Sequence, residues 1–102
     1  MEIKEIQKEV DKLIQKYGGY WKPLSMMARI TEEVGELARA MNIKHGDKRS
    51  KGESDGRDIE KELADVVFTT FAIANAEGVD LEKVFMEKLG LDYKKMEETY
   101  SK

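Results

Sequence analysis

Two pairs of carboxylates on helix-like stretches constrain this chain more than any other feature of its sequence. The members of each pair stand three residues apart, and the pairs are Glu33 with Glu36 and Glu62 with Asp65. Residues at this spacing point from one face of a helix. With an advance of about 100° per residue, Glu33 falls next to Ile30 and Leu37, while Asp65 falls beside Ala72. Both pairs therefore lie on apolar helix faces, and we expect them to converge.

Two interpretations of these pairs compete. The ordinary one is a solvated helix face with i,i+4 salt bridges, and 38% of the residues are charged, so some acidic pairs arise by chance. One isolated pair would favour that interpretation. Two pairs on separate helices, both on the apolar side and without matched basic residues, favour a divalent metal site. The reason is that a buried carboxylate needs a cation, a metal or a raised pKa.

The composition narrows the class of protein. A length of 102 residues fits a single domain, 1–102, with a modest core. Because the chain has no cysteine, disulfides, thiol nucleophiles and cysteine-based zinc sites are excluded. Its 18 basic and 21 acidic residues are intermixed, which argues against a nucleic-acid binder. With neither a leader nor an apolar run of membrane-spanning length, we expect a soluble, cytoplasmic protein without a membrane partner.

The apolar periodicity predicts an all-α fold, a small bundle of four helices. The expected helices cover about 2–17, 24 or 25 to 45, 59–77 and 81–89, and residues 92–102 either continue as helix or fray. Gly18 and Gly19 end the first helix and Pro23 begins the second. Residues 46–57 form a loop without apolar residues. Its basic side chains either reach over an anionic ligand or are simply solvated, and they are Lys48, Arg49, Lys51 and Arg57.

The third expected helix is apolar almost all round, through Val66-Val67-Phe68 and Phe71-Ala72-Ile73-Ala74. Such a helix requires burial on every side. Three other helices of this length do not easily enclose it, so we expect a homo-oligomer with this helix near the subunit interface.

All-oxygen ligation suits a hard cation such as Mg²⁺, with Mn²⁺ as a substitute. A di-iron bundle requires Glu-x-x-His motifs, which the single histidine, His45, does not supply. Mg²⁺ on a few carboxylates normally meets a phosphate-bearing substrate, which favours attack of metal-activated water on phosphorus. Tyr20 and Trp21 either cap the end of the bundle or form a stacking wall for a planar ligand such as a nucleobase. Thr69 either orients a ligand carboxylate or bonds to its own helix.

The motif Glu33-x-x-Glu36 … Glu62-x-x-Asp65, with 25 residues between its halves, resembles that of the MazG-like nucleotide pyrophosphohydrolases. PLSMMARITEEVGELARA resembles the second helix of this family, and ELADVVF with the apolar run after it resembles the third. Asn75, the turn Gly78-Val79-Asp80-Leu81 and Lys88 match in kind and place, so the resemblance covers residues 20–89. After Lys88 the segment Gly90-Leu91-Asp92-Tyr93-Lys94-Lys95 departs from the Asn or Arg that the family often carries, and Lys94 or Lys95 are candidate substitutes.

The resemblance implies an all-α nucleoside triphosphate pyrophosphatase, a homodimer or dimer of dimers, that cleaves between the α- and β-phosphates and serves nucleotide-pool house-cleaning. It implies the metal ligands Glu33, Glu36, Glu62 and Asp65 for Mg²⁺, and Glu32 or Glu36 as the catalytic base. It places Lys88 at the phosphates and Trp21 and Asn75 near the base or sugar. The alternative is a non-catalytic helical module that binds a nucleotide or another protein.

Overall fold

The computed structural model describes residues 1–46 and 57–100, and the described part contains four helices and no strand. They are α1 (Ile3–Lys16), α2 (Pro23–His45), α3 (Arg57–Ala76) and α4 (Leu81–Tyr100). The predicted all-α fold is confirmed, and the first three helices have bounds within about two residues of those expected. The predictions for Lys48, Arg49 and Lys51 fall outside the described residues.

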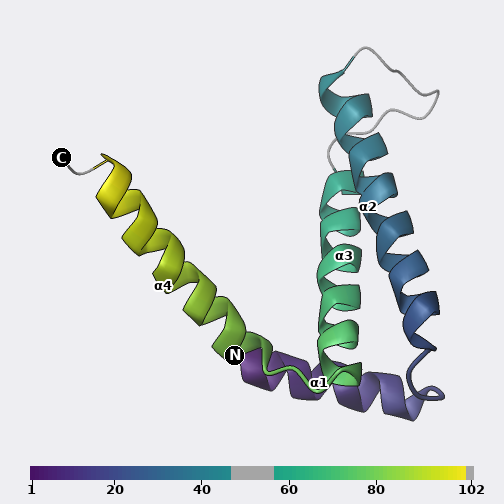
Figure 1. Cartoon of the computed structure of the whole chain (residues 1–102). Helices are drawn as coiled ribbons and strands as arrows, with labels where there is room; N and C mark the ends of the chain where they lie inside the picture. The colour runs from purple at the N-terminus through teal and green to yellow at the C-terminus, as the bar shows by residue number, and fades with distance from the viewer. Residues whose placement is uncertain (47–56, 101–102) are drawn as a thin grey trace.

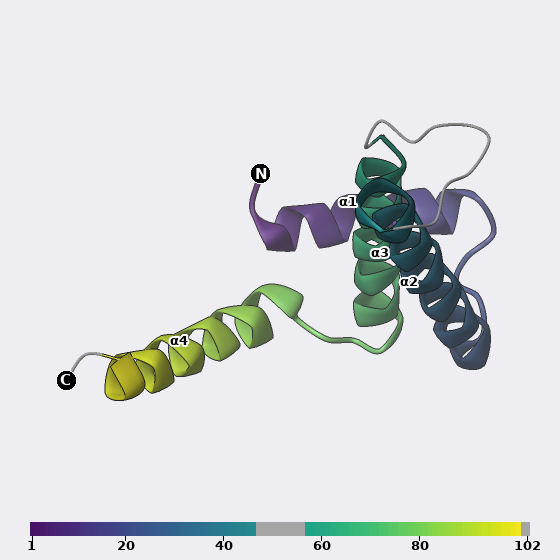
Figure 2. The same ribbon diagram turned by 90° about the horizontal axis from the view of Figure 1, so that it is seen from above.

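The helices α2 and α3 run antiparallel, side by side, and α1 crosses the end of this pair where α2 begins and α3 ends (Figure 1). The last helix, α4, leaves from the same end and diverges from the other three, as the view from above also shows (Figure 2). No helix in the described ranges is both long enough and apolar enough to cross a membrane.

Glycines and a proline set the connections between these helices. Gly18 and Gly19 have φ angles of 112° and 88°, which glycine adopts without a steric penalty, and Gly19 N–H donates to Ile14 O at 2.9 Å. Pro23 occupies the first turn of α2, where its missing N–H costs nothing. Gly78 closes α3 with a φ of 68°. The chain therefore turns sharply on both sides of the α2–α3 pair.

The last helix differs from the prediction. We expected an interruption at Gly90, but α4 is continuous from Leu81 to Tyr100. Glycine inside a helix costs roughly 1 kcal/mol relative to alanine, and the strong helix formers around Gly90 offset that cost. The weak preference of Gly90 against helix is therefore outweighed by the residues around it.

The core lies between α1, α2 and α3 and is small. Its buried apolar side chains are Val10, Met26, Ala40, Phe71, Ala72 and Ala74. The helix α4 has no buried residue, and large apolar side chains along it are exposed: Val84, Phe85, Met86, Leu89, Leu91, Tyr93, Met96 and Tyr100. One side of α3 is also open, since Val67 is 51% exposed. A single chain thus leaves much apolar surface in water.

A buried glutamine joins α1 to the turn between α3 and α4. Gln7 donates from Nε2 to Asn75 Oδ1 at 3.0 Å and to Val79 O at 2.9 Å. In return, Asn75 Nδ2 donates to Gln7 O at 2.9 Å, and Leu81 N–H donates to Gln7 Oε1 at 2.9 Å. A buried amide is stable when its polar atoms are satisfied in this way, so the network fixes where α1 crosses α3.

Candidate active site

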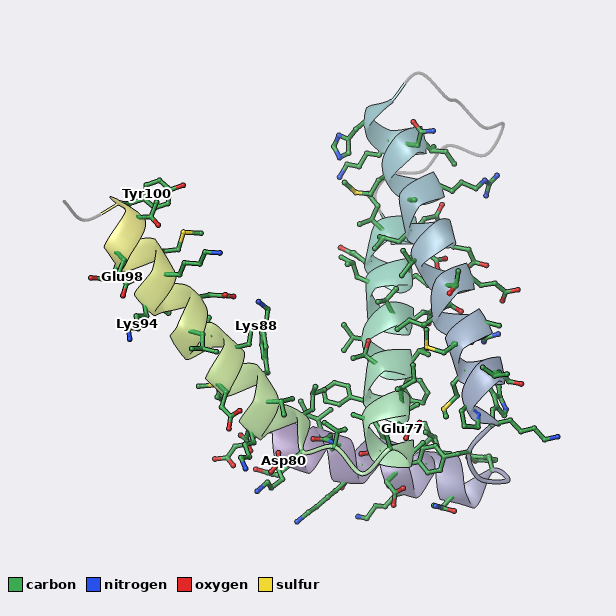
Figure 3. All side chains as sticks on the ribbon, in the orientation of Figure 1. Glu77, Asp80, Lys88, Lys94, Glu98 and Tyr100 are labelled. Carbon is green, nitrogen blue, oxygen red and sulfur yellow. The ribbon has the colours of Figure 1, made fainter. Side chains whose placement is uncertain are left out.

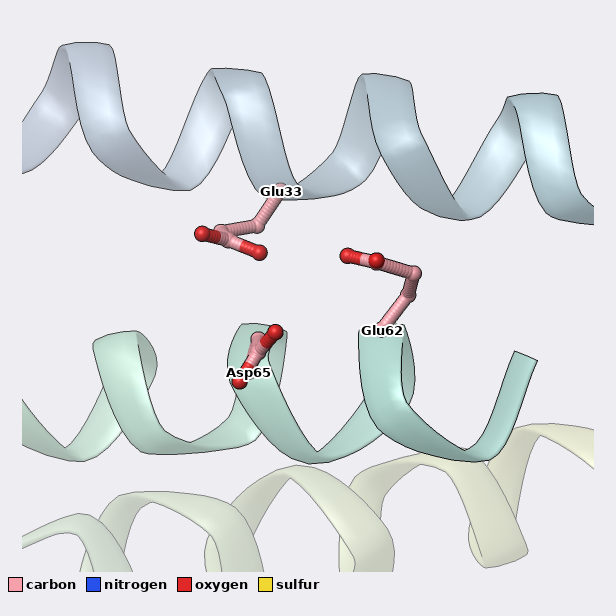
Figure 4. A group of neighbouring side chains, drawn as sticks. All are labelled: Glu33, Glu62 and Asp65. Atoms are coloured by element: carbon pink, nitrogen blue, oxygen red, sulfur yellow. The ribbon is translucent and has the colours of Figure 1, made fainter. Parts of the chain in front are cut away.

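Three of the four predicted metal ligands meet between α2 and α3. Glu33 comes from the middle of α2, and Glu62 and Asp65 come from α3 (Figure 4). A carboxylate oxygen from each of the three lies within 4.8 Å of the others. Glu33 and Glu62 are buried and Asp65 is half-buried. We call these three residues the acidic cluster. The i,i+3 spacing puts Glu62 and Asp65 on the face of α3 that α2 covers.

The other two predicted carboxylates lie on exposed positions of α2, Glu32 and Glu36. Glu36 sits beside the acidic cluster, because the Glu62 carboxylate is the main cause of a raised pKa at Glu36. The predicted roles of Glu36 as a fourth ligand and of Glu32 or Glu36 as the base stay predictions.

Among the described residues, two cationic side chains contact the acidic cluster. Arg29 Nε lies 3.1 Å from Glu33 Oε1, while Lys61 Nζ lies 3.4 Å from Glu62 Oε1 and 3.0 Å from Asp65 Oδ2. The expectation that no basic residues match these carboxylates was therefore wrong. The sequence does contain the spacing that predicts these ion pairs, because Arg29 precedes Glu33 by four residues and Lys61 precedes Asp65 by four.

These cations leave part of the negative charge uncompensated. In the described part of the chain, the buried atoms Glu33 Oε2 and Glu62 Oε2 have no hydrogen-bond partner. Burial is the main cause of a raised pKa at Glu33, and the carboxylates of Asp65 and Glu36 raise this pKa further. A buried oxygen without a partner is costly, so the described part of the chain supplies too little positive charge to pair every buried oxygen of the cluster.

The donor set fits a hard divalent cation. All its atoms are carboxylate oxygens, the ligands that Mg²⁺ and Mn²⁺ prefer. A cation among them would give Glu33 Oε2 and Glu62 Oε2 the partner that each lacks. The geometry therefore agrees with the metal site expected from the sequence.

A cavity of about 350 Å³ opens beside the acidic cluster, and Glu33 and Asp65 form part of its wall. Its other walls come from the end of α1, the connection between α1 and α2, and the facing sides of α2 and α3. Four aromatic side chains line it: Tyr17, Tyr20, Trp21 and Phe68. The volume lies toward the lower end of the range for small-molecule sites, roughly 300–1,000 Å³. An aromatic cavity that ends in carboxylates suits a planar ligand with an attached anionic, metal-binding group.

Two predicted substrate-binding residues line this cavity. Trp21 is 56% exposed, and the Arg29 guanidinium lies over its ring, with 5.2 Å between Cζ and the ring centroid. Thr69 is buried in the cavity wall, and its hydroxyl donates to Asp65 O at 3.0 Å, the bond to its own helix that the ordinary interpretation expected. Beside them, the Tyr20 hydroxyl donates to Asp11. Burial and Asp11 raise the pKa of Tyr20 to about 12.

The other two predicted substrate-binding residues lie elsewhere. The Asn75 side chain is engaged by Gln7 at the end of α3. Lys88 stands on the diverging helix α4 (Figure 3) and bonds to Asp92 at 2.8 Å. Within one chain neither residue lines the cavity, and their roles stay predictions. Four further residues of the site were not predicted from the sequence: Arg29, Lys61, Tyr17 and Phe68.

Comparison with known proteins places this architecture in a family. The family model of the MazG nucleotide pyrophosphohydrolase domain matches residues 21–98. The protein YpjD of Bacillus subtilis (strain 168) is 45% identical over 82 residues, which are 79% of this chain and 74% of YpjD.

Solved structures agree with this match. The crystal structure of YPJD from Bacillus subtilis has a TM-score of 0.79 at 41% identity, over 88% of this chain and 93% of that one. The Bacillus-conserved MazG protein, a nucleotide pyrophosphohydrolase, has a TM-score of 0.75 at 42% identity, over 88% and 87%. The iMazG protein from Vibrio DAT 722 has a TM-score of 0.66 at 27% identity, over 91% and 99%. This chain therefore belongs to the MazG family of nucleotide pyrophosphohydrolases.

Proposed function

We propose that this enzyme hydrolyses nucleoside and deoxynucleoside triphosphates between the α- and β-phosphates, releasing the monophosphate and pyrophosphate. The observation that carries the proposal is the junction of an aromatic cavity with the acidic cluster, since Glu33 and Asp65 belong to both. The cavity suits a nucleobase, and the carboxylates suit the cation that accompanies a triphosphate. Removal of unwanted nucleotides from the cellular pool is the role that we infer for this reaction.

The cation of this proposal is Mg²⁺, with Mn²⁺ as a substitute, and its ligands are Glu33, Glu36, Glu62 and Asp65. When bound, such a cation neutralises phosphate charge and lowers the pKa of a coordinated water. The chain itself supplies a proton acceptor, either Glu32 or Glu36. Both side chains are exposed on α2, and Glu36 lies beside the acidic cluster, where the Glu62 carboxylate raises its pKa.

The nucleobase would stack in the cavity against Trp21, with Thr69 in the wall beside Asp65. Base stacking on an aromatic side chain is tolerant of base identity, because every base has a π-face. Apart from the acidic residues and Arg29, the lining side chains with polar atoms are Tyr17, Tyr20, Trp21 and Thr69. The hydroxyls of Tyr20 and Thr69 already donate to other groups of the protein. We therefore infer that shape and size select the base more than hydrogen bonds do.

We also propose that the functional unit is a homodimer or a dimer of dimers. The exposed apolar side chains of α4 and the open side of α3 support an interface there. The predicted phosphate contact of Lys88 gives a second reason. Lys88 stands on α4, which diverges from the α2–α3 pair that holds the acidic cluster of its own chain (Figure 3), so that contact requires either a movement of α4 or the cluster of another subunit.

Pyrophosphate release from a panel of ordinary and damaged (d)NTPs, with Mg²⁺ and with EDTA, tests the reaction. We expect metal-dependent pyrophosphate and an equal amount of monophosphate. Orthophosphate as the product would contradict the cleavage point. Absence of turnover across the panel, with a melting temperature that still rises with metal and nucleotide, would instead favour the non-catalytic nucleotide-binding module.

The two candidates for the base separate in single-turnover experiments. General-base catalysis typically contributes about 10²- to 10⁴-fold, so replacing the base by glutamine lowers the rate of the chemical step by that factor. The variants Glu32→Gln and Glu36→Gln serve as each other's control. Calorimetry of Mg²⁺ binding distinguishes the two roles, because loss of a metal ligand weakens Mg²⁺ binding and loss of the base does not.

A further inference from the structure

Arg29 stands between the two halves of the proposed site. Its guanidinium contacts the acidic cluster through Nε, 3.1 Å from Glu33 Oε1, and covers the ring of Trp21 at 5.2 Å. All three residues line the same cavity. The planar guanidinium can donate from its edge and stack with its face at the same time, so one side chain holds both contacts.

The two partners of Arg29 differ in how firmly the fold holds them. Glu33 sits in the middle of α2 and its side chain is 8% exposed. Trp21 lies in the connection between α1 and α2 and is 56% exposed. The position of the indole thus depends more on Arg29 than the position of the carboxylate does.

We propose that Arg29 is a positioning residue that couples the presence of a cation in the acidic cluster to the placement of Trp21. This inference rests on the proposed function, because it takes the cluster as a divalent metal site. A divalent cation competes with Arg29 for Glu33 and repels the guanidinium, so the guanidinium and the indole beneath it shift together. The aromatic wall of the cavity is then set by the state of the acidic cluster.

Coupling of this kind is reciprocal. If cation binding changes the placement of Trp21, a planar ligand stacked on Trp21 must change the affinity of the cluster for the cation by the same factor. The cavity wall and the cluster would then respond to a metal–nucleotide complex as one unit.

Lys61 provides a matched control for Arg29. It also neutralises the acidic cluster, through Glu62 and Asp65, but it does not line the cavity that contains Trp21. Each of the two cations precedes one of its carboxylate partners by four residues on the same helix. Removing either should affect cation binding similarly, and only Arg29 should affect Trp21.

Intrinsic fluorescence reports the coupling directly, because Trp21 is the sole tryptophan of the chain. The protein is titrated with Mg²⁺ at constant ionic strength, without nucleotide, and tryptophan is excited selectively. Calorimetry follows Mg²⁺ binding in parallel. For the unmodified protein we expect a saturable change in emission with the same midpoint as the calorimetric binding curve.

Three variants complete the experiment. Arg29→Met should shift the emission of the metal-free protein, lose most of the Mg²⁺-dependent change and bind Mg²⁺ about twofold more tightly, the usual worth of an i,i+4 ion pair. Arg29→Lys keeps the charge and should restore part of the emission change. Lys61→Met should also tighten Mg²⁺ binding but keep the full emission change.

The possible outcomes separate the coupling from the proposed function. Mg²⁺ binding without an emission change in the unmodified protein, or a full change in Arg29→Met, would overturn the coupling and leave the metal site standing. No Mg²⁺ binding by calorimetry would overturn the metal site and the coupling together. If Arg29→Met fails to fold by circular dichroism, Arg29→Gln replaces it with the same expected loss.

Discussion

Glu33 on α2 and Glu62 on α3 face each other with one buried carboxylate oxygen each, Oε2, that has no hydrogen-bond partner in the described part of the chain. Arg29 and Lys61 occupy the other oxygen of each residue. A native fold rarely leaves such atoms unpaired without a reason. These two unpaired oxygens are therefore the strongest structural indication of a bound cation.

Glu33→Gln should abolish the stabilisation by Mg²⁺ and lower kcat by about 100-fold or more, since even residues that only support a metal ligand are worth about 10- to 100-fold. The amide keeps the volume of the side chain but removes the charge. Thermal unfolding with and without Mg²⁺, together with pyrophosphate release, measures both effects. Glu60→Gln, at an exposed position of α3, is the control, and similar behaviour of the two variants would refute the assignment of Glu33.

The metal-free protein should lose stability as pH rises through the range just above 4.5. Burial and the neighbouring carboxylates raise the pKa of Glu33 above its ordinary 4.5, so in this range the folded chain binds more protons than the unfolded chain. The free energy of unfolding then falls with increasing pH. The contribution of Glu33 to the free energy of unfolding is fully present below pH 4.5 and is lost as the pH rises through the raised pKa.

Urea unfolding at a series of pH values, in EDTA, measures this effect. The decrease of the free energy of unfolding with pH should be smaller in Glu33→Gln, because this variant lacks the titrating carboxylate. Mg²⁺ affinity should follow the opposite trend and rise with pH, because the cation displaces protons from its ligands. A metal-free slope that is equal in both proteins would count against the raised pKa.

Trp21→Ala should raise KM for the nucleotide about tenfold while kcat changes little, because stacking of a base on an aromatic side chain is worth about 1–3 kcal/mol. Trp21→Phe keeps a stacking face and should restore most of the affinity. Steady-state kinetics with one preferred (d)NTP gives both constants. An alanine variant with unchanged KM would show that Trp21 only covers the end of the helix pair.

Gln7→Ala should lower the free energy of unfolding by about 1–2 kcal/mol, because it removes the hydrogen bonds of a buried amide to partners that are themselves partly exposed. The partners that lose their bonds are Asn75 Oδ1, Val79 O and Leu81 N–H. Gln15→Ala, at an exposed position of the same helix, should change stability by less than about 0.5 kcal/mol. Denaturant unfolding measures the free energy of unfolding of both variants. Equal values for the two would show that the hydrogen-bond network contributes little to stability.

Phe85→Lys should reduce the molar mass measured by light scattering and lower activity, if α4 forms the proposed interface. A charge placed at the centre of an apolar interface is costly unless it finds a partner, and Phe85 is one of the exposed apolar residues of α4. Glu87→Lys, also exposed on α4, controls for the charge itself. An unchanged mass in Phe85→Lys would place the interface elsewhere.

The sequence by itself predicted the four helices and included the three residues of the acidic cluster among its four candidate ligands. Periodicity is a local property, so the apolar spacing along α1, α2 and α3 and the punctuation by Gly18, Gly19 and Pro23 were sufficient to place these helices. The spacing of three residues likewise placed Glu62 and Asp65 on one face, and the structure turns that face toward Glu33. Two expectations were wrong. The break at Gly90 weighed one weak preference without its helix-forming neighbours, and the absence of basic partners overlooked Arg29 and Lys61, each four residues before a carboxylate.

The tertiary structure alone decided how these elements meet. Periodicity states which residues share a helix face but not the angle at which two helices cross, and that angle brings Gln7 to Asn75 and leaves α4 apart from the acidic cluster. The contact of Arg29 with Trp21 likewise depends on the path of the connection between α1 and α2. Such contacts join residues whose separation is set by packing rather than by the helical repeat, and for that reason no local pattern in the sequence encodes them.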